Sequence, residues 1–409
     1  MSTITIRNIG PIKSLTMKLN KINVIMGPQS SGKSTIAKII SFCSWLEKGV
    51  ENAGQITHSL NNLTKVLKDY HRLSETYFDE SSEIYYEGEQ LAFSYNNHSV
   101  PDWEFNVLHL NEKEYIYERV SLNKKNFKVI YIPSERNFVS VVPNLREYAE
   151  DNDNLMDFIR NWYEAKRKYD KLHALKILDL DVDYYNIENS DTDNIILENG
   201  KEIKLKSASS GLQSLIPLIT LYDYVVKGIY TEEKPISVEL RDIVLKRYKD
   251  LLQQRKINNQ KVKSEDISTL LDIIISKKYS SSKLIIEEPE QNLFPEAQRD
   301  LVYYMIQMLN ESERKHDLIL TTHSPYILYA LNNCMMAGLV YEKMSEKSKQ
   351  KLKCKLSRID PKMVSIFQIT DGEINSIQQK DGLIGNNFFD EKMKDLMDDF
   401  YTMLNYYGK

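Results

Sequence analysis

The sequence contains little cysteine, glycine or proline. Its 409 residues include 3 Cys, 14 Gly and 11 Pro. Cys43, Cys334 and Cys354 are far apart and odd in number, which argues against a disulfide framework and against a zinc site. The shortage of glycine and proline reflects the compositional bias of the chain and indicates no function. The cysteine content fits a reducing, cytoplasmic environment best.

The sequence also lacks a long uninterrupted apolar run. The longest one, SLIPLITLYDYVV from Ser214, is broken by Pro217 and Asp223 and is shorter than the roughly 20 residues that a bilayer requires. The N-terminal stretch MSTITIRNIG alternates apolar and polar residues, unlike a secretory signal, and predicts a first strand. We therefore predict no membrane-spanning segment and no membrane partner.

No strong excess of either charge is present. The net charge is −4, which argues against a surface coated with positive charge for nucleic acid. Residues 246–263 and 343–358 are nevertheless basic. Each stretch fits either the solvated face of a helix or loop or an arm that contacts nucleic acid, so nucleic-acid binding is left open.

The segment GPQSSGKST predicts a phosphate-binding loop. It follows the apolar run KINVIMG and precedes the helical pattern STIAKIISFCSWLEK, which is the strand, loop and helix order of the G-x-x-x-x-G-K-[ST] motif. Backbone N–H groups of the loop would bind phosphate, Lys33 would reach the β and γ oxygens, and Ser34 would ligate Mg²⁺. The predicted ATP-contacting residues are Gly27, Gln29, Ser30, Ser31, Gly32, Lys33, Ser34 and Thr35.

Two later strands end in residues suited to ATP hydrolysis. The segment SKLIIEEPEQNLFPEAQ places Glu287 and Glu288 at a strand end, which is typical of a Walker B motif. We assign Glu287 to the metal and Glu288 to the base that polarises the attacking water. The segment DLILTTHSPYIL ends its apolar run at His323, which we expect to contact the γ-phosphate or the water.

A third segment, KSASSGLQSLIPLITLYDYV, predicts a long helix whose first turn could bind an anion. Ser209, Ser210, Gly211 and Gln213 stand at its N-terminus, where free N–H groups and hydroxyls lie together. The segment lies between the phosphate loop and the acidic strand. That order is typical of an ABC-type ATPase signature.

Together these motifs make the chain similar to a known group of proteins. The chain resembles the ABC/SMC-like ATPases related to the OLD family, including the ATPase subunits of bacterial anti-phage systems such as Septu and PARIS. The resemblance lies in five motif segments, GPQSSGKST, YIPSER, SSGLQS, LIIEEPEQNLFP and TTHSPYIL. The resemblance implies an α/β P-loop ATPase head with a mixed sheet, short helical insertions and no long coiled coil. It also implies bound ATP and Mg²⁺.

The resemblance further implies how the site is completed. Two heads would enclose ATP as a homo-oligomer that is at least a dimer, with Ser210 and Gly211 of one subunit at the γ-phosphate of the other. Asn292 and Gln291 would lie in the interface loop, and His323 would be the switch histidine. Gln55 and Gln90 are both candidates for the Gln loop, and neither is assigned.

The order of motifs divides the chain into six expected parts. They are residues 1–140 with the phosphate loop, 141–180 as a short helical arm, 181–231 with a hairpin and the signature helix, 232–280 as a helical insertion, 281–335 from the acidic strand to the histidine, and 336–409 as C-terminal strands and helix. Residues 144–178 are compatible with a helix, Asn199-Gly200 suits a type I′ hairpin turn, and AGLVYE reads as a short strand. The 86 residues after His323 are too few for the Toprim nuclease domain of OLD proteins, and Asp371-Gly372 reads as a hairpin turn rather than a nuclease centre.

These observations give two readings of function. The first is an ATPase that senses or regulates through ATP-dependent head dimerisation and controls a separately encoded effector, a nuclease or toxin, in anti-phage defence. The second is a DNA repair or recombination ATPase of the RecF/SMC type that clamps DNA.

Overall fold

The computed structural model describes residues 2–53, 60–89, 91–97, 101–107, 127–142, 145, 153–231 and 279–407. Within them, eleven strands form one mixed sheet in the order β6-β5-β4-β1-β2-β15-β14-β3-β13-β12-β7. Its strands are β1 (Thr3–Ile9), β2 (Ile12–Lys18), β3 (Ile22–Met26), β4 (Phe78–Glu87), β5 (Leu91–Asn97), β6 (Pro101–Val107), β7 (Phe127–Ile132), β12 (Ser281–Glu287), β13 (His316–Thr322), β14 (Val364–Thr370) and β15 (Glu373–Ser376).

A second, four-stranded antiparallel sheet has the order β11-β10-β9-β8. Its strands are β8 (Leu175–Lys176), β9 (Asp183–Ile187), β10 (Thr192–Ile196) and β11 (Glu202–Lys204). The α-helices of the described residues are α1 (Lys33–Ala53), α2 (Leu60–Lys65), α3 (Phe138–Val141), α4 (Asn154–Lys166), α5 (Ser210–Asp223), α6 (Ile229–Thr231), α9 (Pro295–Glu311), α10 (Pro325–Val340), α11 (Glu346–Lys351) and α12 (Phe388–Leu404). The predicted α/β class with a mixed sheet is confirmed.

Five neighbouring strands of the large sheet are parallel and carry the motifs. Strand β3 lies between β14 and β13, and β12 lies between β13 and β7, all in parallel register. The carboxyl ends of parallel strands meet at one edge, so residues that follow β3, β12 and β13 come together there although they are far apart in sequence.

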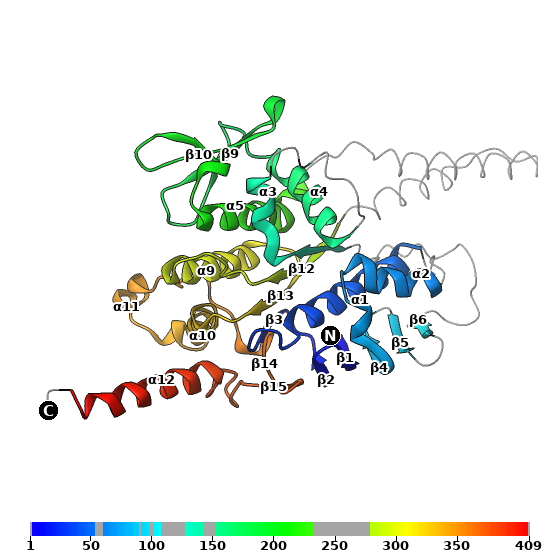
Figure 1. Ribbon diagram of the computed structural model, residues 1–409. Coiled ribbons are helices and arrows are strands. Elements are labelled where there is room, and N and C mark those ends of the chain that lie inside the picture. Colours follow the sequence, from blue (N-terminus) through cyan, green and yellow to red (C-terminus); the bar gives the residue numbers. More distant parts are fainter. Residues whose placement is uncertain are drawn as a thin grey trace, which may run out of the picture.

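Alternating residues of these strands pack into two separate cores. In β12, Leu284 and Ile286 face one core while Ile285 faces the other, as the period of two in a strand requires. Helix α1 packs in the core on one face, between the parallel strands and β1, β4 and β5. Helices α4, α5, α9 and α10 pack in the core on the opposite face (Figure 1).

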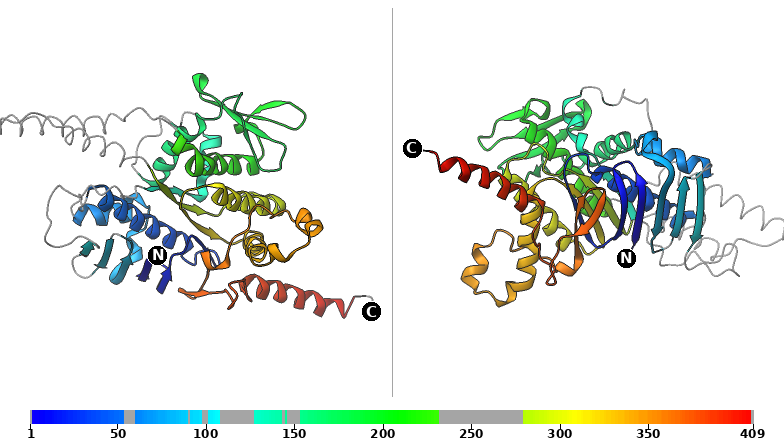
Figure 2. Two further views of the ribbon diagram at one scale, coloured as in Figure 1. Left: turned by 180° about the vertical axis from the view of Figure 1, so that it is seen from behind. Right: turned by 60° about the horizontal axis from the view of Figure 1, so that its bottom comes forward.

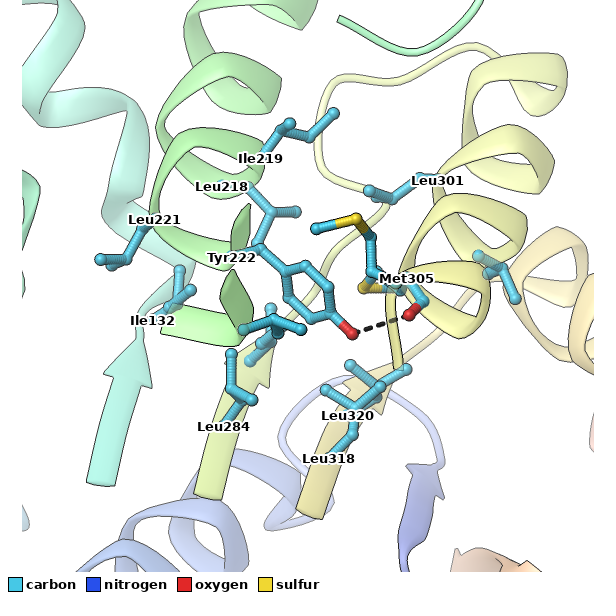
Figure 3. Packing of buried hydrophobic residues seen from close by; sticks show 14 of the residues in the cluster. Ile132, Leu218, Ile219, Leu221, Tyr222, Leu284, Leu301, Met305, Leu318 and Leu320 are labelled. Atoms are coloured by element: carbon cyan, nitrogen blue, oxygen red, sulfur yellow. Dashed lines mark hydrogen bonds between the residues drawn. The ribbon is translucent and has the colours of Figure 1, made fainter. Parts of the chain in front are cut away.

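The core between α5 and α9 is drawn in Figure 3. Tyr222 of α5 is buried between Leu284, Leu320 and Met305, and its hydroxyl donates to the Met305 carbonyl at 2.8 Å. Pro217 lies inside α5 without ending it. The predicted apolar helix that follows the signature segment is therefore present, and its residues from Ser214 to Tyr222 are all buried.

Three local expectations differ from the structure. Helix α4 ends at Lys166, and residues 175–176 form β8 because this segment turns back onto the small sheet, where Asn186 N–H bonds to the Tyr169 carbonyl at 2.7 Å. The segment AGLVYE is helical and not a strand, since residues 337–340 end α10 and Tyr341 and Glu342 begin a 3-10 helix. A side chain at Gly338 would meet the Ile359 carbonyl at 2.1 Å, so this glycine allows the helix to pack closely there.

The third difference is in the hairpin between β10 and β11. The two strands pair as predicted, but of Asn199 and Gly200 only Gly200 has positive φ (+74°), whereas a type I′ turn needs both. The turn at Asp371-Gly372 does have positive φ at both residues (+52° and +82°) and joins β14 to β15 as expected. No described helix exceeds the 21 residues of α1, so the described ranges contain no long coiled coil.

We predict that the Tyr222 side chain is a major source of stability. Tyr222→Ala should lower the free energy of unfolding by about 3–5 kcal/mol, because it empties a fully buried aromatic site. Tyr222→Phe should cost only about 1 kcal/mol, since it removes one hydrogen bond and keeps the packing. Urea unfolding followed by circular dichroism measures both values. Equal losses in the two variants would contradict the assignment of most of the stability to packing.

Candidate functional site

The phosphate loop lies between β3 and α1 as predicted. Ser30 and Gly32 have φ of +59° and +101°, and the loop enters α1 with the Ile36 N–H bonded to the Gly32 carbonyl at 3.0 Å. A Cβ on Gly27 would stand 2.8 Å from Ser31 Oγ and 3.2 Å from the Ile369 carbonyl, so the loop is tightly curled at this glycine. This curvature turns successive backbone amides toward the same concavity.

Lys33 is buried inside that loop. Its side chain donates to the carbonyls of Gly27 at 2.8 Å and Pro28 at 2.6 Å, and the residue is 6% exposed. Burial lowers the pKa of Lys33, and the negative charges of Glu288, Glu290 and Glu287 oppose that shift. The ammonium therefore lies where it can meet both a bound anion and the acidic strand ends.

The other polar groups of the loop fit phosphate and a divalent cation. Ser31 Oγ is buried and has no hydrogen-bond partner, which is expected of a group that contacts a ligand. Ser34 is half-buried in the first turn of α1 and Thr35 is buried, while Gln29 and Ser30 are exposed at the loop tip. The loop amides, the N-terminus of α1 and Lys33 together suit a triphosphate.

Glu287 ends β12 and points toward α1. It is 4% exposed and its Oε1 accepts from the Tyr131 hydroxyl at 2.5 Å. Burial raises the pKa of Tyr131 well above the usual value, and Glu287 adds to that rise. Tyr131 thus fixes one carboxylate oxygen of Glu287, and the other can serve a cation.

Glu288 and His323 form an ion pair at the edge of the sheet. His323 Nε2 lies 3.2 Å from Glu288 Oε2, and about 30% of each side chain is exposed. The hydrogen bond to Glu288 raises the pKa of His323, and the same bond lowers the pKa of Glu288. Glu288 has φ of +42°, a left-handed conformation that turns its carboxylate away from the strand direction. Two groups assigned from sequence to the same reaction are therefore in contact.

Glu290 is a residue of this site to which the sequence analysis assigned no role. It is 8% exposed, and its Oε1 accepts from Thr322 Oγ1 and from the His323 backbone N–H, both at 2.8 Å. Its Oε2 is buried without a partner, and burial raises the pKa of Glu290. Glu290 holds the end of β13 against the loop after β12. The third acid in EEPE was the available signal.

Arg136 is another residue of this site to which the sequence analysis assigned no role, although it belongs to the motif segment YIPSER. Its guanidinium is fully buried and donates to three carbonyls of the loop after β12, those of Glu287 (2.9 Å), Glu288 (2.8 Å) and Pro289 (3.2 Å). Its Nε donates to the Ser214 carbonyl of α5 at 3.1 Å. Burial lowers the pKa of Arg136 to about 10, and the three nearby glutamates counteract that shift. Arg136 thus joins the signature helix to the acidic strand end.

The signature residues do not lie beside the phosphate loop of the same chain. Ser209 caps α5, accepting from the Leu212 N–H, and both Ser209 and Ser210 are exposed. Gln213 donates to the carbonyls of Lys206 and Ala208, so its side chain turns back onto its own loop. Helix α5 packs on the sheet face opposite α1 (Figure 2). The side-chain hydrogen bonds of Ser209 and Gln213 are made within residues 206–213 and do not reach residues 27–35.

Asn292 connects the signature turn to the acidic loop. It has φ of +61°, and its Nδ2 donates to Ser214 Oγ at 2.9 Å. A Cβ on Gly211 would meet the Asn292 carbonyl at 3.0 Å, so the glycine allows this close approach. Gln291 Oε1 is buried without a partner. Gln55, Gln90 and residues 232–278 lie outside the described residues.

Other classes of site find no support in the described part of the chain. The three cysteines are buried and unbridged, and burial raises the pKa of each thiol. No group of three or more His, Cys, Asp or Glu side chains there is arranged to hold a metal ion. No described helix combines the length and the apolar character that crossing a bilayer requires.

A family model described as an AAA ATPase domain matches residues 143–328 of this chain. The match covers the signature segment, the acidic strand and His323, and it begins after the phosphate loop. Among curated proteins, none matches this chain. The chain is therefore similar to an ATPase over the part that supplies Glu287, Glu288 and His323.

Solved structures similar to this chain share little sequence identity with it. The SMC head domain from Thermotoga maritima is 10% identical, with 92% of this chain and 98% of that chain covered and a TM-score of 0.37. An Smc head domain with an extended coiled coil bound to the C-terminal domain of ScpA, from Pyrococcus furiosus, is 10% identical, with 97% and 99% covered and a TM-score of 0.40. The recombination mediator protein RecF is 11% identical, with 92% and 97% covered and a TM-score of 0.32.

We predict that Glu288 sets the ionisation of His323. In Glu288→Gln the pKa of His323 should fall toward its ordinary value of about 6.5, because the partner charge is removed and the shape is kept. NMR titration of the His323 ring signal measures the change, with Glu391→Gln on α12 as the control. An unchanged His323 pKa in Glu288→Gln would contradict the contact.

The Glu288–His323 pair also determines how the stability of the fold changes with pH. The raised pKa of His323 contributes stability that is full below about pH 6.5 and is lost as the pH rises through its folded pKa. The lowered pKa of Glu288 contributes stability that is full above about pH 4.3 and is lost as the pH falls through its folded pKa. The pair therefore stabilises the fold most between about pH 4.3 and 6.5.

Proposed function

We propose that this protein is an ABC-type ATPase that binds ATP in the loop of residues 27–35 and hydrolyses it with Glu288 as base. The observation that carries the proposal is the meeting of Lys33, Glu288 and His323 at the edge where β3, β12 and β13 end. The match to an AAA ATPase domain supports the same reaction.

Each group in the site has a separate task in this proposal. The loop amides and Lys33 bind the β and γ phosphates, and Ser34 and Glu287 hold Mg²⁺, which when bound neutralises phosphate charge. Glu288 orients a water and takes its proton as the water attacks. His323 donates from Nε2 to Glu288 at 3.2 Å and so holds the carboxylate in place. The lowered pKa of Glu288 keeps it ionised at neutral pH.

We further propose that the site is completed by a second head. Ser209, Ser210 and Gly211 stand on an exposed turn on the sheet face opposite α1, so they are free to meet another subunit. Arg136 and Asn292 link that turn to the loop carrying Glu288. Closure of two heads around two ATP molecules would therefore affect the catalytic carboxylate of Glu288.

We propose that head closure controls a separately encoded effector, a nuclease or toxin, in anti-phage defence. The proposed role in defence rests on the resemblance of the five motif segments to the OLD-related group. A second candidate, a DNA-clamping repair ATPase, is favoured by the exposed lysines between α10 and β14. The exposed lysines of this segment are Lys343, Lys347, Lys351, Lys353 and Lys355, and together they carry a strong positive charge.

Two inactive variants should restore each other. Lys33→Ala removes the phosphate contact and Ser210→Arg blocks the signature turn, so each protein alone should lose ATP hydrolysis by about 100-fold or more. A mixed dimer holds one intact composite site, so mixing the two should recover a substantial part of the activity in a phosphate-release assay. Absence of recovery, with both variants folded by circular dichroism, would contradict a site shared between subunits.

A trapped variant should reveal the partner. Glu288→Gln should bind ATP but hydrolyse it at least about 100-fold more slowly, because the water loses its base. Tagged Glu288→Gln, purified from the native host with ATP and analysed by mass spectrometry, should retain a nuclease or toxin in fixed ratio, and Lys33→Ala should retain less. Recovery of DNA and repair proteins alone would favour the clamp.

A further inference from the structure

Helix α12 stands off the body of the protein. Asn387 caps its first turn, the Phe388 N–H donates to Gln368 Oε1 at 2.8 Å, and Tyr329 hydrogen-bonds to Asp390. None of the 17 residues of the helix is buried, and it extends away from the sheet in every view (Figures 1 and 2). The head therefore holds the first turn of α12 and leaves the rest exposed.

One face of α12 is apolar along its length. Met393, Leu396, Phe400 and Met403 are 60%, 66%, 52% and 64% exposed. With Phe389 before them and Tyr407 after them, they are separated by steps of 4, 3, 4, 3 and 4 residues. These alternating steps of four and three residues average 3.6 and place the side chains in one straight apolar seam, which another helix with the same alternation can cover.

The charges of α12 exclude two other kinds of occupant. Glu391, Asp395 and Asp398 lie on the face opposite the seam, where Lys394 is the single basic residue, so that face is acidic overall. An amphipathic helix that binds an anionic membrane carries Lys and Arg on its polar face, and nucleic acid is likewise repelled by carboxylates. A protein helix remains, and the acidic face would stay in water.

We propose that the seam of α12 pairs with the same seam of a second copy of this chain, in antiparallel orientation. Lys392 and Asp399 are seven residues apart on the same flank of the seam. In an antiparallel pair, equal flanks face each other, so Lys392 of each copy meets Asp399 of the other. Met393 then packs against Leu396 of the second copy, and the two-fold axis repeats both contacts.

The flank charges favour self-pairing over a different partner. Lys392 pairs within its own helix with Asp395 at 3.0 Å, but both side chains are well exposed and such i,i+3 pairs are weak. In this register Phe400 of each copy faces Phe389 of the other, so the pairing removes Phe389, Met393, Leu396 and Phe400 from water in both copies. The pairing needs no nucleotide.

The first test is the oligomeric state of the full chain without nucleotide. Sedimentation velocity should show a reversible dimer, and Leu396→Asp should abolish it over the same concentration range because it places a carboxylate in the seam. Thr402→Asp is the matched control, since it adds the same charge on the polar face of α12. A wild-type monomer, or a dimer that survives Leu396→Asp, would overturn the proposal.

A charge exchange separates self-pairing from a different partner. Lys392→Asp should weaken the dimer several-fold, since it sets Asp against Asp399 twice, and adding Asp399→Lys should restore it. The double variant regains complementarity only with another copy of itself. Failure of the double variant to dimerise, while the wild type does, would contradict the antiparallel register.

The outcome is independent of the proposed ATP reaction. Leu396→Asp should keep the nucleotide-dependent association of heads in the Glu288→Gln background, because the two surfaces are separate. Loss of nucleotide-free dimers with retained ATP-dependent dimers would support both proposals. If the Glu288→Gln protein with an unchanged α12 does not associate when ATP is added, that result contradicts the proposed function and leaves the α12 proposal unaffected.

Discussion

The burial of the Arg136 guanidinium is the constraint on which the rest of the site depends. A charge without exposure to water is costly unless hydrogen bonds and nearby opposite charges compensate it. Arg136 obtains this compensation from carbonyls of Glu287, Glu288, Pro289 and Ser214, with the glutamate carboxylates close enough to favour its charged form. The loop after β12 and the start of α5 must therefore keep their present arrangement or leave the guanidinium unsatisfied.

That requirement joins two structural layers. Residues of the parallel strands alternate between a core under α1 and a core under α5 and α9, so the sheet separates the phosphate loop from the signature turn. Arg136 and Asn292 bond to Ser214 of α5, and Glu290 bonds to the end of β13, so the loop after β12 is connected to both. In the proposed function, the contacts of Arg136 and Asn292 with α5 carry the consequence of head closure to the loop of Glu288.

The two proposed associations differ in their chemistry. Head closure would depend on phosphate charge and on exposed hydroxyls and N–H groups of a signature turn. The α12 seam would depend on burial of apolar side chains and would resist salt, whereas its flanking ion pairs would be screened by it. A chain with both surfaces could hold two heads near one another before ATP arrives, which raises their effective concentration for closure.

Much of the site could be predicted from the sequence, because its motifs are local. The strand, loop and helix around Lys33, and the acids and histidine at two strand ends, are each specified within about a dozen neighbouring residues, and the parallel strands of an α/β sheet then bring them to one edge. The hairpin turn at Asp371-Gly372 was likewise predicted from two residues. The order of the eleven strands was not, since pairing of distant strands is decided by packing and not by local preference.

The tertiary structure alone decided how these pieces are connected. Arg136 bonds to Glu287 across 151 residues, and nothing in the word YIPSER tells which carbonyls it meets. The helix at residues 144–178 was predicted too long, because contacts of Tyr169 and Asn186 with the small sheet outweigh helix propensity after Lys166. The sequence by itself determined the chemistry of the site, because the residue types stand at fixed local spacing. Only packing decided which backbone groups position these side chains and which face of α12 is left uncovered.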